Sequence, residues 1–345
     1  MIFLFALILS FVVTGLVSKF GKYFGILDDP QKHKLPKVIH TIPVPRGGGI
    51  PIFLAVCLGL LIFIGPTTKV LGITTACLLL TVIGVLDDLF EEKVSPYLRL
   101  LINIAASFLV VLSGIGISYI TNPLGGILNL PWYLADTFAL VWLVWMQNII
   151  GWSSGVDGQL PGFVIIAAIT MASLSGNSQI AIVLATLTAG AYLGFLPWNW
   201  YPQKIMPGYG GKSLAGFLLG VLAILSSAKV GALILVLGIP FLDAVRVIIK
   251  RISEGRSPVW GGREHFHHFL LDLGWGKRRI AIFYWVVSAL LAILALNLNS
   301  RLKYFTMATG TLLFFGAFAW WNYWLVLSKR PGLASGSKTS LSSGR

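Results

Sequence analysis

The chain has 345 residues, of which 56% are hydrophobic and only 11% are charged. Soluble globular domains carry about 25% charged residues, so this composition excludes a soluble enzyme, a disordered chain and a disulfide-rich secreted domain. Lys and Arg outnumber Asp and Glu by 26 to 12, which gives a formal net charge of +14. No nucleic-acid-binding motif accompanies this charge, and the sequence indicates a membrane protein without a nucleic-acid partner.

Apolar segments without charges recur along the chain at lengths that can cross a bilayer. A membrane-spanning helix needs about 20 apolar residues, because each adds about 1.5 Å to a core about 30 Å thick. We predict an all-α polytopic membrane protein with about eleven transmembrane helices (ten or eleven), in a single domain over residues 1–328, followed by a flexible cytoplasmic tail over 329–345. The helices are expected within residues 2–18, 47–68, 70–86, 100–135 (with an external excursion), 137–156, 158–203 (two helices), 213–228, 230–246, 280–300 and 304–328.

The distribution of basic residues predicts the orientation of these helices. If the N-terminus lies outside, the cytoplasmic loops and the cytoplasmic C-terminus contain all but four of the 26 Lys and Arg residues. This bias agrees with the positive-inside rule. The same orientation places all five histidines and every acidic residue except Asp136 inside. We therefore expect a multi-pass protein of the cell inner (plasma) membrane, in contact with membrane lipids, with active-site loops on the cytoplasmic face.

Two adjacent carboxylates, Asp87 and Asp88, end the third predicted span. They repel each other and so favour a cation or basic neighbours, and the negative end of a helix dipole disfavours them further. They are candidates for holding Mg²⁺ with substrate phosphates, or for acting as a base on a phosphate-bearing lipid. The alternative interpretation is a solvated helix end.

Two other cytoplasmic loops combine polar residues with glycines. The first has His40 and Arg46 ahead of three glycines, which suits an anion at a helix N-terminus and suits lipid head groups even better. The loop after the fifth span runs from Asn148 to Asp157. These two side chains are candidates for contacting a polar ligand, although the glycines between them indicate only a tight turn.

The loop after the ninth span is the richest in side chains suited to a diphosphate. It contains His265, His267 and His268 beside Arg256 and Arg263. Three histidines without a cysteine make zinc a weaker interpretation. A Gly-Lys-Ser sequence earlier in the chain lacks the first glycine and the preceding strand of a nucleotide-hydrolysing loop, so we reject that function.

The ordered set of loops resembles the polyprenyl-phosphate N-acetylhexosamine-1-phosphate transferases of glycosyltransferase family 4. The resemblance covers roughly residues 1–328, and its six features are specific in their order rather than singly. They are His40 with Pro43-Val-Pro-Arg-Gly-Gly, Asp87-Asp88, Asn148 through Asp157-Gly158, the segment 208–220 ending Gly-Phe-Leu-Leu-Gly, Pro240-Phe-Leu-Asp-Ala-Val-Arg246, and Gly255-Arg-Ser-Pro with His265-Phe-His-His. The last form is similar to the GlcNAc-1-phosphate branch rather than the muramoyl-pentapeptide branch.

This resemblance implies transfer of an N-acetylhexosamine-1-phosphate, here GlcNAc-1-phosphate, from a UDP-sugar such as UDP-GlcNAc to undecaprenyl or another polyprenyl phosphate, with release of UMP. That step begins a cell-envelope polysaccharide such as peptidoglycan or lipopolysaccharide. The resemblance also implies catalytic roles for Asp87 and Asp88, and Mg²⁺ held by these two residues and Asp157. The substrate-binding residues it implies are His40, Arg46, Asn148, Asp157, Lys212, Arg256, His265, His267 and His268. A homodimer is left open.

The sequence departs from the family pattern at four chemical positions. In the nucleotide motif Gly151 replaces an asparagine and Ser154 an aspartate, and Gly262 stands where an aspartate precedes the histidines. Tyr209 stands where the family has its magnesium carboxylate. A neutral phenol, with a pKa of about 10, cannot replace a carboxylate on a cation that prefers anionic oxygen, and Lys212 adds a positive charge nearby.

Three functions remain open from the sequence. The first is an active sugar-1-phosphate transferase, and the second is a catalytically impaired paralogue that binds lipid phosphate or a partner transferase. The third is an unrelated transporter, which would place ionisable groups at mid-membrane depth. Only Asp243 and Asp157 come near that depth. Arg246 lies one helical turn from Asp243, which predicts a local ion pair rather than a translocation site.

Overall fold

The computed structural model describes residues 1–21, 23, 25–31, 40–90, 94–122, 126–227, 229–258 and 262–328, so the predicted tail over 329–345 lies outside the described residues. Two short antiparallel hairpins pair β1 (Leu27–Asp28) with β2 (Val44–Pro45) and β3 (Tyr119–Thr121) with β4 (Ile127–Asn129). The helices in the described part of the chain are α1 (Ile2–Phe20), α2 (Gly49–Phe63), α3 (Thr68–Leu89), α4 (Pro96–Leu112), α5 (Trp132–Trp152), α6 (Gln159–Leu174), α7 (Gln179–Asn199), α8 (Gly208–Leu225), α9 (Val230–Val236), α10 (Gly238–Ser253), α11 (Phe266–Asp272), α12 (Lys277–Asn297) and α13 (Ser300–Ser328).

The lengths and composition of these helices confirm an all-helical membrane protein. Among the described residues, seven helices are long and apolar enough to cross a membrane alone, namely α1, α3, α5, α7, α8, α12 and α13. The pair α9 and α10 passes the same test together, and α2, α4 and α6 are shorter apolar helices. Each predicted span overlaps one of these helices or the pair. The count of eleven spans and the orientation stay predictions.

The predicted ninth span, 230–246, is not one straight helix. Helices α9 and α10 meet at Leu237 with a bend of 87°. Pro240 explains the break, because its ring nitrogen has no hydrogen to donate to the carbonyl of Val236, four residues earlier. Hydropathy continues unchanged across this point, so the apolar run alone does not reveal the bend.

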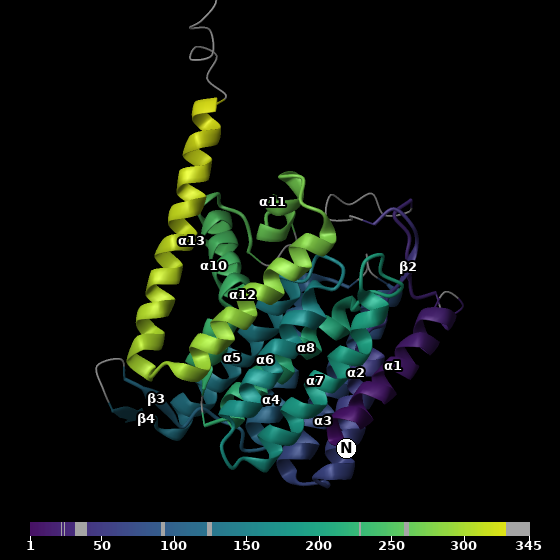
Figure 1. Ribbon diagram of the computed structural model, residues 1–345. Helices are drawn as coiled ribbons and strands as arrows, with labels where there is room; N and C mark the ends of the chain where they lie inside the picture. Colours follow the sequence, from purple (N-terminus) through teal and green to yellow (C-terminus); the bar gives the residue numbers. More distant parts are fainter. Residues whose placement is uncertain are drawn as a thin grey trace, which may run out of the picture.

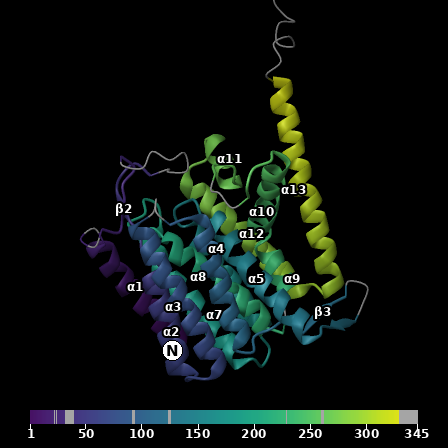
Figure 2. The ribbon, with the colours of Figure 1, turned by 180° about the vertical axis from the view of Figure 1, so that it is seen from behind.

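Figure 1 shows the N-terminus and the β3–β4 hairpin at one end of the bundle, and β2 and α11 at the other. The view from behind (Figure 2) shows the same separation. Helix α8 is central, and 83% of its apolar 18-residue segment is buried, whereas α13 stands at the edge and none of its apolar segment is buried. The loops that carry the predicted site residues therefore begin and end at one end of a helical bundle.

Small residues allow the central helices to pack closely. A Cβ added to Gly194 of α7 would lie 2.3 Å from the carbonyl oxygen of Leu7 in α1. A Cβ added to Gly216 of α8 would lie 2.3 Å from the carbonyl oxygen of Met146 in α5. Small residues at such contacts are the usual means of helix association in membranes.

Candidate active site

Three glycine-rich segments meet at the start of α8. The Gly48 nitrogen donates to the carbonyl oxygen of Met206 at 3.2 Å, and the Met206 nitrogen donates to that of Pro45 at 2.8 Å. A Cβ on Gly84 of α3 would lie 2.4 Å from the Cα of Gly210. Because no side chain fits between them, the N-termini of α2 and α8 come together with the last turns of α3.

Asp88 lies at the N-terminus of α8. The backbone nitrogen of Tyr209 donates to its Oδ1 at 3.2 Å, and the positive end of the helix dipole favours a carboxylate there. A Cβ on Gly208, where φ is +64°, would lie 2.1 Å from Asp88 Oδ2, so glycine makes this approach possible. Arg46 and Lys212 are also close enough to interact electrostatically with Asp88. The buried carboxylate thus has the basic neighbours that the sequence predicts.

Asp87 has a partner of its own on α4. Arg99 Nε donates to Asp87 Oδ1 at 2.5 Å, and the Arg99 guanidinium lies over the ring of Tyr209, 5.5 Å from its centroid. The Tyr209 hydroxyl is 2.7 Å from Asn103 Oδ1 and donates to it. The phenol therefore points toward α4 and is held there by an amide.

In the first loop, the two predicted binding residues converge on a carboxylate. Arg46 donates through Nη2 and Nε to Asp28 Oδ2, at 2.5 and 3.2 Å. His40 Nε2 lies 3.7 Å from Asp28 Oδ1. The β1–β2 pairing, with Asp28 opposite Val44, sets these side chains beside each other.

The histidines form a stacked cluster anchored by Asp243 of α10. His265 Nδ1 is 2.9 Å from Asp243 Oδ2, and Arg246 Nη2 donates to Asp243 Oδ1 at 2.7 Å, which confirms the predicted local ion pair. The rings of His265 and His267 stack at 6.0 Å, and those of His267 and His268 lie 4.3 Å apart. The cluster is buried, and its order depends on a carboxylate from another helix.

The loop after α5 packs directly on this cluster. The Trp152 ring stacks on His265 at 6.4 Å between centroids. A Cβ on Gly155 would lie 2.0 Å from His267 Nε2. The nucleotide-like loop and the histidine loop, more than a hundred residues apart in sequence, are therefore neighbours.

Burial keeps two of the histidines uncharged at neutral pH. It lowers the pKa of His267 well below its usual range, and the charges of His268, His265 and Lys212 lower it further. Burial, with the nearby positive charge of Arg263, lowers the pKa of His268 to about 4. In the described part of the chain, Nδ1 of each ring is buried and makes no hydrogen bond. A neutral imidazole offers one donor and one acceptor, so the cluster can bind a polar ligand without adding charge.

Lys212 connects the two halves of the site. It interacts electrostatically with Asp88 on one side and with His267 on the other. The charge of Lys212 thus acts on the aspartate at the start of α8 and on the histidine cluster.

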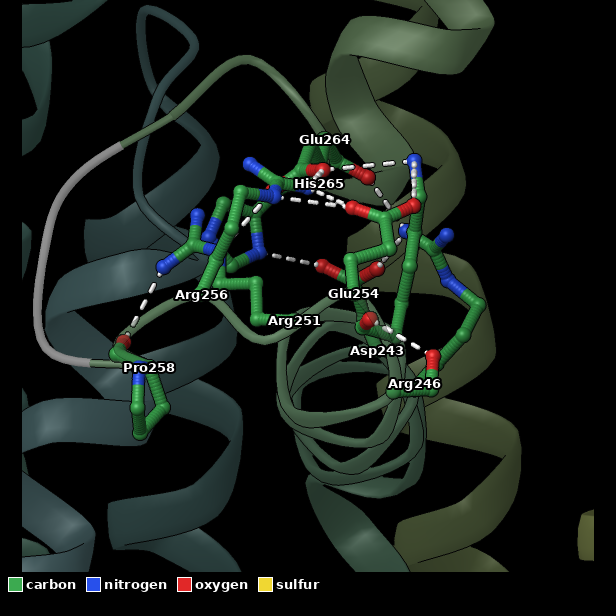
Figure 3. A network of polar contacts seen from close by, with 10 residues as sticks. Asp243, Arg246, Arg251, Glu254, Arg256, Pro258, Glu264 and His265 are labelled. Atoms are coloured by element: carbon green, nitrogen blue, oxygen red, sulfur yellow. Dashed lines mark hydrogen bonds and ion pairs between the residues drawn. The ribbon is translucent and has the colours of Figure 1, made fainter.

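Glu264 forms ion pairs with basic residues that precede the histidines (Figure 3). It accepts hydrogen bonds from Arg251 at 2.8 Å and Arg256 at 2.5 Å, and it forms an ion pair with Lys250 at 3.2 Å. Burial raises its pKa, but hydrogen bonds from these three cations outweigh burial and lower the pKa to about 2. Arg256 pairs with Glu254 as well. The predicted diphosphate ligand Arg256 is therefore bound within an internal ion-pair network.

Asn148 belongs to the last turns of α5, and Asp157 to the loop that follows this helix. Asn148 Nδ2 donates to the carbonyl oxygen of Val144 in its own helix, at 2.8 Å. Asp157 accepts from the Gln203 nitrogen at 3.2 Å and pairs with Lys277 Nζ at 3.4 Å. Asp157 thus joins the end of α7 to the start of α12.

Comparison with known proteins finds a matching family model and several similar transferases. Residues 70–227 match the glycosyl transferase family 4. A probable undecaprenyl-phosphate N-acetylglucosaminyl 1-phosphate transferase of Bacillus subtilis is 28% identical over 86% of this chain and 84% of its own length. A decaprenyl-phosphate N-acetylglucosaminephosphotransferase of Mycolicibacterium smegmatis is 26% identical over 81% and 78%. An undecaprenyl-phosphate alpha-N-acetylglucosaminyl 1-phosphate transferase of Yersinia pestis is 27% identical over 93% and 89%. Over most of its length the chain is therefore similar to these transferases.

The similarity to these transferases implies Mg²⁺, which the donors around the aspartate pair would have to hold. Among the residues that the structure describes, no three His, Cys, Asp or Glu side chains are grouped so that they could hold a metal ion. The expected set of Asp87, Asp88 and Asp157 is therefore not brought together. Asp87 pairs with Arg99 and Asp157 with Lys277. The residues present do not fit a Mg²⁺ site, and the metal stays an implication of the family.

Several residues of the site were not singled out from the sequence as members of it. Asp28, Arg99, Asp243, Glu264 and Lys277 all pair with predicted site residues or with their neighbours. The clustering of acidic residues on one predicted side of the membrane was the only general signal. Apart from the Asp243–Arg246 pair, it could not assign their partners, because which side chains meet depends on how the loops and helices pack, as between Asp157 and Lys277.

Proposed function

We propose that this chain transfers GlcNAc-1-phosphate from UDP-GlcNAc to a polyprenyl phosphate, undecaprenyl phosphate in the first instance, and releases UMP. The observation that carries the proposal is Asp88 at the N-terminus of α8, where its Oδ1 accepts from the Tyr209 nitrogen at 3.2 Å. A carboxylate and the N-terminus of a helix thus meet at the end of the bundle that also carries the histidine cluster, and the charge of Lys212 acts on both. The named relatives, which act on undecaprenyl or decaprenyl phosphate by name, support it.

The chemistry suits these groups. An oxygen of the lipid phosphate forms a bond to the sugar-bearing phosphorus of UDP-GlcNAc, and the bond from that phosphorus to the bridging oxygen breaks, so UMP leaves with the bridging oxygen. Such transfer depends mainly on positioning and on neutralising charge. Asp88 orients the lipid phosphate and accepts its proton, while the helix N-terminus and Lys212 stabilise the phosphate oxygens.

The remaining predicted residues have supporting roles in the proposal. His265, His267 and His268 donate hydrogen bonds to the diphosphate-sugar, with Asp243 as the positioning residue of His265. Asn148 and Asp157 contact the nucleotide, and His40 and Arg46 line the side of the lipid phosphate. Asp87 supports Asp88, the other member of the catalytic pair, and Arg256 attracts the diphosphate through the basic network around Glu264.

The proposal includes a membrane arrangement. The seven long helices, the bent pair and the three shorter apolar helices support eleven spans, with the N-terminus outside and the site loops and C-terminus in the cytoplasm. The bias of basic residues supports this orientation. The protein would be multi-pass in the inner membrane, a single domain over 1–328 that begins a cell-envelope polysaccharide such as peptidoglycan or lipopolysaccharide.

The experiment is an assay of purified protein in detergent with UDP-GlcNAc and undecaprenyl phosphate, with UMP release followed by chromatography. UMP release that needs both substrates supports the proposal. Hydrolysis without the lipid, or no release with any UDP-N-acetylhexosamine, contradicts it. Cross-linking in the same detergent tests the homodimer.

A second candidate is the catalytically impaired paralogue that binds lipid phosphate or a partner transferase. One observation favours it: the phenol of Tyr209 stands where the family carries a carboxylate, and it is bound to Asn103. This candidate predicts binding of undecaprenyl phosphate without UMP release. The transporter alternative has no support from the relatives, which are transferases by name.

A further inference from the structure

Two carboxylates at the predicted catalytic end pair with cations of this chain. Asp87 pairs with Arg99 at 2.5 Å, and Asp28 pairs with Arg46 at 2.5 Å. Asp88 has Arg46 and Lys212 in electrostatic range and accepts from the nitrogen at the start of α8. These groups therefore supply part of the positive charge that adjacent buried carboxylates would otherwise draw from a metal ion.

Tyr209 does not supply the carboxylate oxygen that a metal ion would need at this position. Its hydroxyl donates to Asn103 Oδ1 at 2.7 Å and lies 3.2 Å from the carbonyl oxygen of Arg99. It is thus directed at α4, as part of the same contact that holds Arg99 against Asp87. The phenol and the guanidinium form one assembly at the position where an anionic oxygen would be required.

We infer that Arg99 neutralises Asp87 while the start of α8 holds Asp88, and that this chain binds its diphosphate ligand without a divalent cation. The inference rests on the proposed function for the identity of the ligand. The charge of Lys212 acts on both Asp88 and His267. A compact ammonium charge can bind phosphate.

The first test measures metal binding and needs no turnover. Free Mn²⁺ is followed by electron paramagnetic resonance with purified protein, with and without UDP-GlcNAc, after subtraction of the signal change caused by the nucleotide alone. The wild type is expected to leave Mn²⁺ free, as is Lys229→Ser, a matched loss of a lysine at the opposite end of the bundle. The double variant Tyr209→Asp, Lys212→Ser is expected to bind about one equivalent, because it regains a carboxylate and loses a cation.

The second test measures UMP release from the wild type in EDTA and in Mg²⁺. Rates within about twofold of each other are expected, and a loss of more than about tenfold in EDTA overturns the inference. Binding of about one Mn²⁺ by the wild type also overturns it. If no UMP appears in either condition, the proposed function fails, and the Mn²⁺ measurement still decides the inference.

A second variant keeps the test independent of the double variant's folding. Arg99→Gln removes the cation from Asp87 and leaves Tyr209 in place. It is expected to lower UMP release in EDTA and to recover part of it in Mg²⁺, since Asp87 then lacks its guanidinium. A fall of equal size in both conditions would contradict the role given to Arg99.

Discussion

Asp87 and Asp88 are adjacent in sequence but serve different surroundings. Asp87 faces α4 and pairs with Arg99, whereas Asp88 faces the start of α8 and accepts from Tyr209 nitrogen. Successive residues on a helix point in directions about 100° apart, so one pair of carboxylates reaches two different elements. The division leaves Asp88 as the carboxylate at the N-terminus of α8.

This difference predicts the effect of Asp88→Asn. The amide keeps its oxygen for the Tyr209 nitrogen but cannot accept a proton, so UMP release is expected to fall by at least about a hundredfold while the melting temperature changes little. Asp136→Asn, at the opposite end of the bundle, is the control and is expected to keep its rate. A rate for Asp88→Asn close to that of the control would remove Asp88 from the mechanism.

At the scale of elements, the site depends on three helix ends that meet without side chains between them. Gly49 at the start of α2 and Gly84 of α3 both lie against Gly210 in the first turn of α8. The N-terminus of α8 is therefore held at a fixed distance from Asp88. Glycine lowers the helix propensity, but it allows this close backbone approach, and the resulting packing offsets the cost.

Gly84→Ala is expected to destabilise the protein and to lower UMP release. The new methyl group would lie 2.4 Å from the Cα of Gly210, and relief of such overpacking costs about 1–3 kcal/mol. Thermal unfolding in detergent, followed by intrinsic tryptophan fluorescence, measures the loss. Gly231→Ala in α9, where a Cβ meets nothing within 4 Å, is the matched control. Equal melting temperatures for the two variants would show that the glycine contact is not needed.

The sequence predicted most helices because uninterrupted apolar runs of sufficient length have few other solutions in a membrane. It predicted the α9–α10 segment as one span, since hydropathy does not record that Pro240 has no N–H to donate to the carbonyl four residues earlier. It identified Asp88 and the histidines by residue type, yet it missed Arg99 and Glu264 as members of the site. Those two act through a partner, and pairing of residues across helices is set by packing that a single sequence does not show.

At the scale of the whole molecule, stability should depend on acidification. The pKa of His268 is about 4 in the folded protein and about 6.5 in an unfolded chain. Between these values the unfolded chain binds more protons, so stability rises with pH and is complete above about 6.5. Glu264, with a folded pKa of about 2, adds stability above about 4.5 that is lost as the pH falls toward 2.

Both groups therefore act in the same direction below neutral pH. The melting temperature is expected to fall between pH 7.5 and pH 5, before Glu264 contributes, and His268→Gln is expected to reduce that fall. Circular dichroism in detergent at several pH values measures it. A melting temperature that rises on acidification, or an unchanged slope in His268→Gln, would contradict the assignment of this dependence to His268.

The orientation of the whole bundle decides whether the site can form. The side of the membrane on which a residue lies can be mapped with reagents that do not cross the membrane and that react only at exposed positions. For this map we select Tyr97 and Glu254 at the site end and Leu128 in the β3–β4 hairpin. In a chain with Cys57 and Cys77 changed to alanine, Leu128→Cys is expected to react with an impermeant maleimide on intact cells. Tyr97→Cys and Glu254→Cys are expected to react only after permeabilisation. If these two reacted from opposite sides of the membrane, Asp88 and the histidines would not share an aqueous face, and the transfer reaction could not take place between them.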